Sequence, residues 1–200
     1  MTGNIIPPQV EGSKSDNVHH EVCNSREAAL DLYFTACNRL KEVSKWETLC
    51  NGLLTANFTL CDENGNAVQR MAQEKDFFKI DIPGPGPQDG DGYDWVQIES
   101  IVTEPGEEED VTAIKVRPAS SPVNDKEGTA HFFDSNASST FMIKRKGNTV
   151  YAEIHGRNEK PNTENTSSAV DTVRNAVVAN AAIASFSDIQ WKQLAVGLLS

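Results

Sequence analysis

Residues 141–157 read FMIKRKGNTVYAEIHGR, and this stretch decides the fold class. After Asn148 the apolar residues alternate with polar ones, which is the period of two expected for a strand with one buried face. Gly147 and Asn148 form a two-residue connection suited to a tight hairpin. The stretch therefore predicts two antiparallel strands, at residues 141–146 and 150–157.

The same period of two recurs upstream. In residues 54–60 the apolar positions, such as Phe58, alternate with polar ones, such as Thr59, which indicates a half-buried antiparallel sheet. Residues 62–66, DENGN, tolerate the backbone of a tight turn, after which we expect the chain to pair back through about Met71. We predict seven to eight strands in all, from segments at residues 18–23, 54–60, 76–82, 95–102, 111–117, 131–134, 141–146 and 150–157.

Polar segments separate these strands. Residues 83–92, PGPGPQDGDG, contain prolines that lack a backbone donor and glycines that add conformational freedom, so we expect an irregular loop. The acidic residues 104–110 are predicted to be a solvated hairpin tip. Residues 119–128 are predicted to be a second irregular crossing.

Helical periodicity occurs before and after the strands. Asn24 and Glu27 have the spacing of a capping box, which predicts the start of a helix that Trp46 ends or just follows. From Ser167 onward the pattern is helical again, and a second capping-box spacing at residues 187–190 leaves open one kinked helix or two. A stripe of small residues is expected to let this segment approach another surface closely: Val170, Val173, Val177, Ala181 and Ala184.

Composition favours a single folded domain. The chain has 200 residues, of which 38% are hydrophobic and 24% charged, without the composition of disorder. We expect a flexible arm at residues 1–17 and one domain at residues 18–200. The net charge of -11 disfavours nucleic acid as a partner. Without a secretory signal or an apolar span of about 20 residues, we expect a cytoplasmic protein with no membrane span.

Cysteine and histidine suggest no metal or cofactor site. The cysteines lack C-x-x-C spacing and are expected to be reduced and buried, namely Cys23, Cys37, Cys50 and Cys61. The alternative is a nucleophilic cysteine paired with one of the histidines, which are His19, His20, His131 and His155. Adjacent histidines on a strand point to opposite faces, and the acidic residues of the long loop lack the order of a calcium loop. We expect no metal and no cofactor.

The order of elements resembles the helix-grip fold of the START-like superfamily, which includes polyketide cyclases, lipid-transfer domains and plant allergen-type carriers. The resemblance covers roughly residues 17–200 and implies an α+β protein whose antiparallel sheet curves around a long C-terminal helical segment. It also implies a cavity between the sheet and that segment. The stretches at residues 80–86 and 90–100 are similar to those of Bacteroidetes proteins with no assigned function.

In such a fold the cavity would hold the function. Residues that could line it, or equally fill it, are Phe58, Phe78, Trp95, Phe141, Tyr151 and His155. The leading hypothesis is a non-enzymatic protein that binds a small apolar or amphipathic ligand. The second is a cyclase- or hydrolase-type enzyme with Glu153 or His155 as general base at a polar end of the cavity, unless that strand face is external. The third is a protein that binds a macromolecular partner without small-molecule chemistry. The sequence leaves the oligomeric state open.

Overall fold

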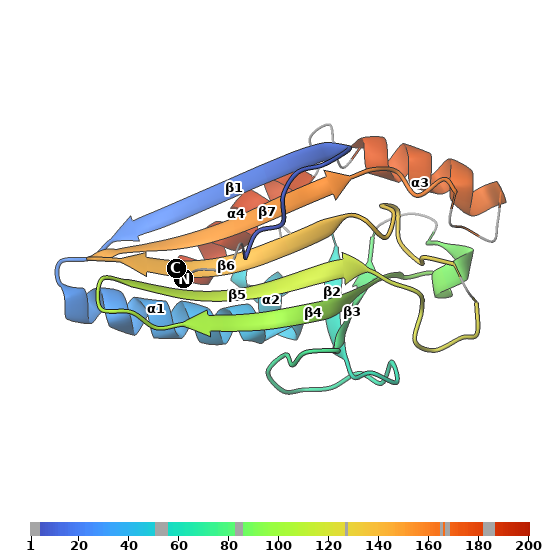
Figure 1. Cartoon of the computed structure of the whole chain (residues 1–200). Coiled ribbons are helices and arrows are strands. Elements are labelled where there is room, and N and C mark those ends of the chain that lie inside the picture. The colour runs from blue at the N-terminus through green and yellow to red at the C-terminus, as the bar shows by residue number, and fades with distance from the viewer. Residues whose placement is uncertain are drawn as a thin grey trace.

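The computed structural model describes residues 5–50, 56–82, 86–126, 128–164, 166, 169–181 and 187–200. They form a curved antiparallel sheet with helices on one side (Figure 1). Within the described residues the sheet has seven strands: β1 (Ser13–Val22), β2 (Asn57–Cys61), β3 (Phe77–Asp81), β4 (Asp94–Glu104), β5 (Glu109–Pro118), β6 (Ser138–Lys146) and β7 (Thr149–Glu159). The predicted α+β class and the hairpin of β6 and β7 are confirmed.

The order of the strands explains why one face of the sheet is covered. Strands β2 to β7 are neighbours in chain order, whereas β1 pairs with β7, so β1 and β2 occupy opposite edges. The chain between them must cross the sheet. It does so as α1 (Arg26–Lys41), the 3-10 turn η1 (Val43–Lys45) and α2 (Trp46–Leu49), with α1 packed on β6 and β7.

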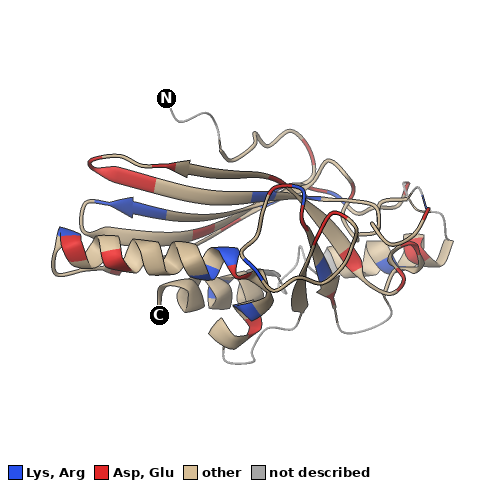
Figure 2. Cartoon of the chain, turned by 90° about the horizontal axis from the view of Figure 1, so that it is seen from below, with Lys and Arg blue, Asp and Glu red and all other residues tan. Residues whose placement is uncertain are grey.

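The start of α1 differs by one residue from the prediction. Its N-cap is Ser25 rather than Asn24, and the Ser25 Oγ accepts a hydrogen bond of 3.1 Å from the backbone N–H of Ala28. This bond satisfies one of the donors that the first turn of a helix leaves unpaired. The exposed side of α1 carries interspersed acidic and basic residues (Figure 2).

Trp46, the first residue of α2, lies in the main core between the sheet and the helices. Its side chain is fully buried, and its ring centroid lies 5.4 Å from Phe58, 5.5 Å from Phe78 and 4.9 Å from Phe141. The indole N–H donates to the carbonyl of Arg39 at 3.2 Å. Because tilted aromatic pairs at these distances attract one another beyond their area of contact, this cluster ties α2 to three strands.

The other face of the sheet is covered in places by loops and by the N-terminal segment. Ile5 and Ile6 pack on β5 and β6. Near the ends of β3 and β4, Trp95 and Phe77 form a separate small cluster with Ala130. We call this the outer face.

β1 begins at Ser13, earlier than the predicted start at residue 18, and pairs with β7. The residues before it, within the predicted N-terminal arm, bond to Asn158. The Asn158 Oδ1 accepts from the backbone N–H of Val10 at 2.7 Å, and its Nδ2 donates to the carbonyl of Pro8 at 3.3 Å.

The C-terminal segment forms two helices, α3 (Ala169–Ala181) and α4 (Ser187–Leu199). In α4, Leu194 and Leu198 are buried, and the helix packs on β1, β7 and α1. Gly197 allows close contact with α2, because a Cβ at this position would lie 2.4 Å from the carbonyl oxygen of Leu49.

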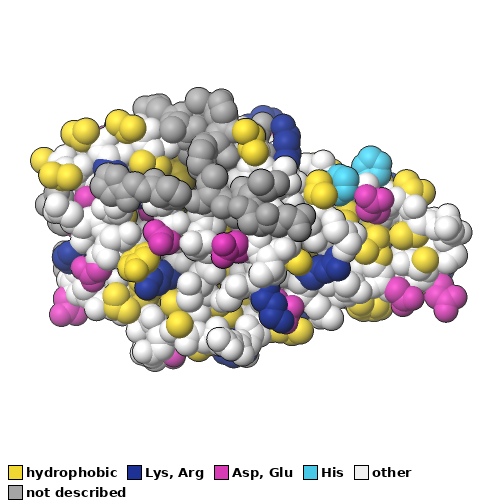
Figure 3. Space-filling view, turned by 180° about the vertical axis from the view of Figure 1, so that it is seen from behind, with side chains coloured by type: hydrophobic (Ala, Val, Ile, Leu, Met, Phe, Trp, Pro, Cys, Tyr) yellow, Lys and Arg dark blue, Asp and Glu magenta, His cyan; other side chains and the backbone are white. Residues whose placement is uncertain are grey.

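The prediction that small residues of α3 face another surface is wrong. Val170, Val173 and Val177 are 62%, 66% and 64% exposed, and hydrophobic side chains stand out at this end of the molecule (Figure 3). The buried face carries polar residues instead, including Asp171 and Arg174. The position of Ala184 lies outside the described residues, as does the side chain of Ala181.

Several segments differ from their predicted structure. Residues 131–134 form no strand and have one bridge, between Phe133 and Pro161. Residues 67–71 likewise make one bridge, from Ala67 to Cys61. The long loop contains a 3-10 turn, η2 (Gln88–Gly90).

The acidic connection between β4 and β5 is predicted to be solvated, but the structure buries part of it. Asp110 is buried and pairs with the fully buried Arg145, whose Nε lies 2.5 Å from Oδ2. Arg145 also donates to the carbonyl of Gly147, so the pair joins two hairpin connections.

Candidate functional site

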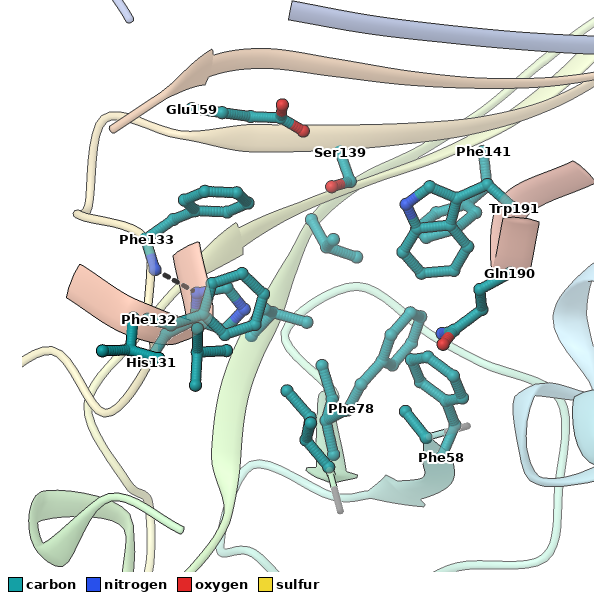
Figure 4. A pocket seen from close by; sticks show the side chains of 17 residues that line it. Phe58, Phe78, His131, Phe132, Phe133, Ser139, Phe141, Glu159, Gln190 and Trp191 are labelled. Carbon is teal, nitrogen blue, oxygen red and sulfur yellow. Dashed lines mark hydrogen bonds between the residues drawn. The ribbon is translucent and has the colours of Figure 1, made fainter. Parts of the chain in front are cut away.

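A pocket of about 300 Å³ lies between the covered face of the sheet and the two C-terminal helices (Figure 4). The sheet forms one wall, residues 131–133 form a second, and α3 and α4 form a third. Most of the lining is apolar: Ala56, Phe58, Phe78, Ile80, Ile82, Val96, Val116, His131, Phe132, Phe133, Ser139, Phe141, Glu159, Val177, Val178, Gln190 and Trp191. Its size lies at the lower end of the range for small-molecule sites.

One end of the pocket is aromatic. Trp191 of α4 lies 6.0 Å from Phe58 and 5.4 Å from Phe141, measured between ring centroids. Phe78 lies 6.4 Å from Phe141 and belongs to the same wall. Flat rings from one helix and three strands therefore offer a surface on which a planar apolar molecule can pack.

The other end carries polar groups. Glu159 and Ser139 lie on the same side of the pocket in Figure 4, and the Ser15 hydroxyl donates to Glu159 Oε1 at 3.2 Å. Gly156 makes room for this carboxyl group, since a Cβ there would lie 2.0 Å from Glu159 Oε1. A space of about 20 Å³ adjoins this end, shares His131, Ser139 and Glu159 with it, and is large enough for one water molecule.

His131 presents a defined chemical face to the pocket. Its Nδ1 accepts a hydrogen bond of 2.9 Å from the backbone N–H of Phe133, and its ring stacks on Phe132 at a centroid distance of 4.2 Å. Burial, and then the positive charge of Arg174, lower the pKa of His131 to about 3. The ring is therefore neutral near pH 7, and its proton is on Nε2.

Polar contacts hold α3 beside the pocket. Arg174 donates to both carboxylate oxygens of Asp94, at 2.5 and 3.2 Å, and both side chains are buried. Asp94 also accepts from the backbone N–H of Phe132 at 3.0 Å. Burial raises the pKa of Asp94 even though the Arg174 guanidinium acts in the opposite direction. These contacts set the orientation in which α3 places Val177 and Val178 against the pocket.

A second contact fixes the beginning of α3. The carboxylate of Asp171 accepts backbone N–H bonds from Gln88 at 2.9 Å and Asp89 at 3.1 Å. The helix is thus attached to η2, which lies in the loop between β3 and β4.

The structure brings three of the predicted site residues together at the pocket: Phe58, Phe78 and Phe141. They come from β2, β3 and β6, and each belongs to the alternating set that faces the helices.

The other three predicted residues, Trp95, Tyr151 and His155, are not among the described residues that line the pocket. Neighbouring residues on a strand point to opposite faces. Val96 lines the pocket and Ile154 lies in the main core, so Trp95 and His155 lie on the outer face. Tyr151 lies four residues before His155 on β7 and therefore on the same outer face. Its ring centroid lies 5.6 Å from that of His20 on β1.

His155 and Glu153, the two residues considered as a general base, form an ionic cluster on that outer face. The His155 ring nitrogens lie 2.5 Å from Asp16 Oδ1 and 2.9 Å from Glu153 Oε2. Burial disfavours the charged ring, but the two carboxylates outweigh it and raise the pKa of His155 above its ordinary value. Lys144 and Arg157 complete the cluster. Its role is to join the edge strand β1 to the sheet.

Seven polar or aromatic residues that line the pocket were not predicted as site residues: His131, Phe132, Phe133, Ser139, Glu159, Gln190 and Trp191. Ser139 precedes Phe141 by two positions on one strand, and this parity alone places the two on the same face. Trp191 stands three positions before Leu194, so helical spacing also predicts a shared face for these two. The contact of His131 with the pocket depends on a loop and has no periodic signal.

The cysteines have no feature of an activated nucleophile. Cys37, Cys50 and Cys61 are buried, and all four cysteines are free thiols. Burial raises the pKa of Cys37 and Cys61 and raises that of Cys50 to about 11. A thiol needs a lowered pKa to react readily, so these environments suit a packing role.

Among the described residues, no cluster of three or more His, Cys, Asp or Glu side chains could hold a metal ion. None of the described helices is long and apolar enough to cross a membrane.

Comparison with solved structures supports the fold described above. No protein-family model matches, and a search of curated proteins found no match. Among solved structures, a hypothetical protein from Helicobacter pylori matches with a TM-score of 0.51 and 11% identity, over 98% of this chain and 90% of that chain. The fold is a helix grip. The similarity to Bacteroidetes proteins stays a prediction.

Two plant proteins have lower scores. Truncated norcoclaurine synthase from Thalictrum flavum matches with a TM-score of 0.39 and 10% identity, over 96% of this chain and 97% of that chain. Major latex-like protein 151 from Panax ginseng matches with a TM-score of 0.38 and 11% identity, over 86% of this chain and 96% of that chain. Similarities this low assign neither a fold nor a role to this chain.

Proposed function

We propose that this protein binds a small apolar or amphipathic molecule in the pocket between the sheet and the C-terminal helices. The observation that carries the proposal is an apolar pocket of about 300 Å³ beside a closely packed core. Protein interiors contain few voids larger than a water molecule. A concave, mostly apolar space of this size is typical of small-molecule sites and favours a role in binding.

The pocket supports binding better than catalysis. A general base works best when its pKa lies near the working pH, whereas the pKa of His131 is lowered to about 3. Glu153 and His155, the residues suggested for an enzyme of cyclase or hydrolase type, belong to the ionic cluster on the outer face. The polar end of the pocket is better suited to orienting a ligand.

The proposal is tested with N-phenyl-1-naphthylamine, an uncharged probe that fluoresces in apolar surroundings. We expect the wild-type protein to bind it with micromolar affinity. Val96→Phe adds a ring inside the pocket, since Val96 is 5% exposed and lines it, and should weaken binding at least tenfold.

Val173→Phe makes the same change on the exposed side of α3 and should leave probe binding unchanged. Absence of probe binding by the wild type, or equal binding by Val96→Phe, would overturn the proposal. Independently of the probe, native mass spectrometry of the purified protein, followed by extraction, would identify a ligand retained from the cell.

A further inference from the structure

The pocket wall at residues 129–133 is fixed by bonds to its backbone. The Asn162 side chain donates to the carbonyls of Thr129 at 2.8 Å and His131 at 3.1 Å, and its backbone N–H donates to the carbonyl of Phe132 at 2.8 Å. Asp94 holds the N–H of Phe132. The position of the His131 ring is therefore set before any ligand enters, which lowers the entropy lost on binding.

The structure also fixes which nitrogen of the His131 ring accepts a hydrogen bond and which can donate one. Nδ1 is occupied as an acceptor by the backbone N–H of Phe133, so the neutral ring must carry its proton on Nε2. The hydrogen bonds among the described residues include none from Nε2, and His131 lines the pocket. This donor is therefore available to a ligand, and a ligand oxygen in the pocket could accept its hydrogen bond.

The surrounding charges indicate what kind of oxygen fits. The positive charge of Arg174 is matched by Asp94, which accepts two bonds from it. The Glu159 carboxyl group lines the same pocket. Two carboxylates that share an apolar site cannot both ionise without a large cost, so a ligand with its own carboxylate is disfavoured. A ligand whose hydrogen-bond acceptor is uncharged is not repelled by Glu159.

Resting on the proposed function, we infer that His131 selects ligands with an uncharged carbonyl oxygen, which accepts a hydrogen bond from Nε2 while a flat apolar body packs against Phe58, Phe141 and Trp191. A pocket of about 300 Å³ favours a compact ring system over a long-chain lipid. This describes an aromatic or alicyclic ketone, aldehyde or ester, rather than a fatty acid.

Three probes of matched shape test the inference by calorimetry: 2-acetylnaphthalene, 2-isopropenylnaphthalene and 2-naphthoate. They present a ketone, an alkene and a carboxylate on one ring system. The wild type should bind the ketone about tenfold more tightly than the alkene, the effect of one buried hydrogen bond. It should bind the carboxylate more weakly than the ketone.

Two variants assign the effect to residues. His131→Phe should lose the preference for the ketone while its affinity for the alkene stays unchanged, which also shows that the pocket is intact. Glu159→Gln, of nearly equal shape, should strengthen binding of the carboxylate and leave the ketone unaffected. In the wild-type protein, ¹⁵N NMR of the imidazole should show Nε2 protonated, with a shift of this signal on adding the ketone but not the alkene.

The outcomes separate this inference from the proposed function. Equal binding of ketone and alkene by the wild type, or carboxylate binding as tight as ketone binding, would overturn the role of His131 and leave ligand binding standing. Binding of none of the probes, including N-phenyl-1-naphthylamine, would overturn the proposed function itself. If His131→Phe fails to fold, the NMR titration of the wild type decides alone, because an unmoved Nε2 signal contradicts the contact.

Discussion

Replacing Arg174 by methionine should destabilise the protein severely, although the position lies on a helix whose other side is exposed. The substitution keeps most of the apolar stem and removes the charge. Asp94, which is 1% exposed, then keeps one hydrogen bond, from the backbone N–H of Phe132. Removing one partner of a buried ion pair typically costs about 3–5 kcal/mol, because an uncompensated charge stays inside the protein.

The assay is urea denaturation followed by circular dichroism and tryptophan fluorescence at pH 7. Asp91→Asn is the matched control, because it breaks an exposed ion pair with Lys126. The side chains of Lys126 and Asp91 are 43% and 53% exposed. An exposed pair of this kind contributes about 0–1 kcal/mol. Adding Asp94→Asn to Arg174→Met should recover part of the loss, since a neutral amide can still accept from Phe132.

The pH dependence gives a second readout. Burial raises the pKa of Asp94, and removal of Arg174 raises it further. A raised carboxyl pKa means that the folded state holds the proton more tightly than the unfolded state, so stability falls as pH rises through the folded pKa. The defect of Arg174→Met should therefore shrink on acidification. The reasoning is refuted if Arg174→Met stays within about 1 kcal/mol of the wild type, or if Asp91→Asn costs as much.

Two further predictions concern the outer face and the core. The pKa of His155 is raised in the folded protein. Ionised His155 therefore stabilises the fold fully below the ordinary histidine pKa of about 6.5, and this stabilisation is lost as pH rises through the folded pKa. Urea midpoints should show this pH dependence in the wild type and in His20→Gln, but not in His155→Gln. A pH profile of His155→Gln that overlays the wild type would contradict it. Trp46→Ala should cost roughly 3–5 kcal/mol in the same assay, whereas Phe34→Ala, at an aromatic side chain that is 60% exposed, should change stability by less than about 0.5 kcal/mol. Similar losses in these two variants would contradict the central position of Trp46.

Strand periodicity predicted most of the sheet because burial of one face imposes it directly. Phe58, Phe78 and Phe141 could be assigned to the face that contacts the helices for the same reason. Periodicity does not say which of two apolar neighbours points inward, and at β4 the smaller residue, Val96, faces the pocket while Trp95 packs under a loop.

The orientation of α3 could not be predicted in this way. Its valine stripe has the spacing of a buried face, but the residues that are buried make polar contacts with partners far away in the chain, such as Asp171 with Gln88 and Arg174 with Asp94. Hydrophobic burial is non-directional, whereas hydrogen bonds require particular partners in particular positions. Those partners are known only once the fold has formed.

The polar attachment of α3 has a thermodynamic consequence for movement at the pocket. Val170, Val173 and Val177 are already largely exposed, and on undocking Asp171 and Arg174 would regain hydration. The apolar surface newly exposed would come mainly from Val178, Ala179 and the residues they cover. Both the heat-capacity change and the urea dependence of an opening scale with the surface exposed. A wall of the pocket can therefore move away with a small heat-capacity change, while the aromatic core around Trp46 stays closed.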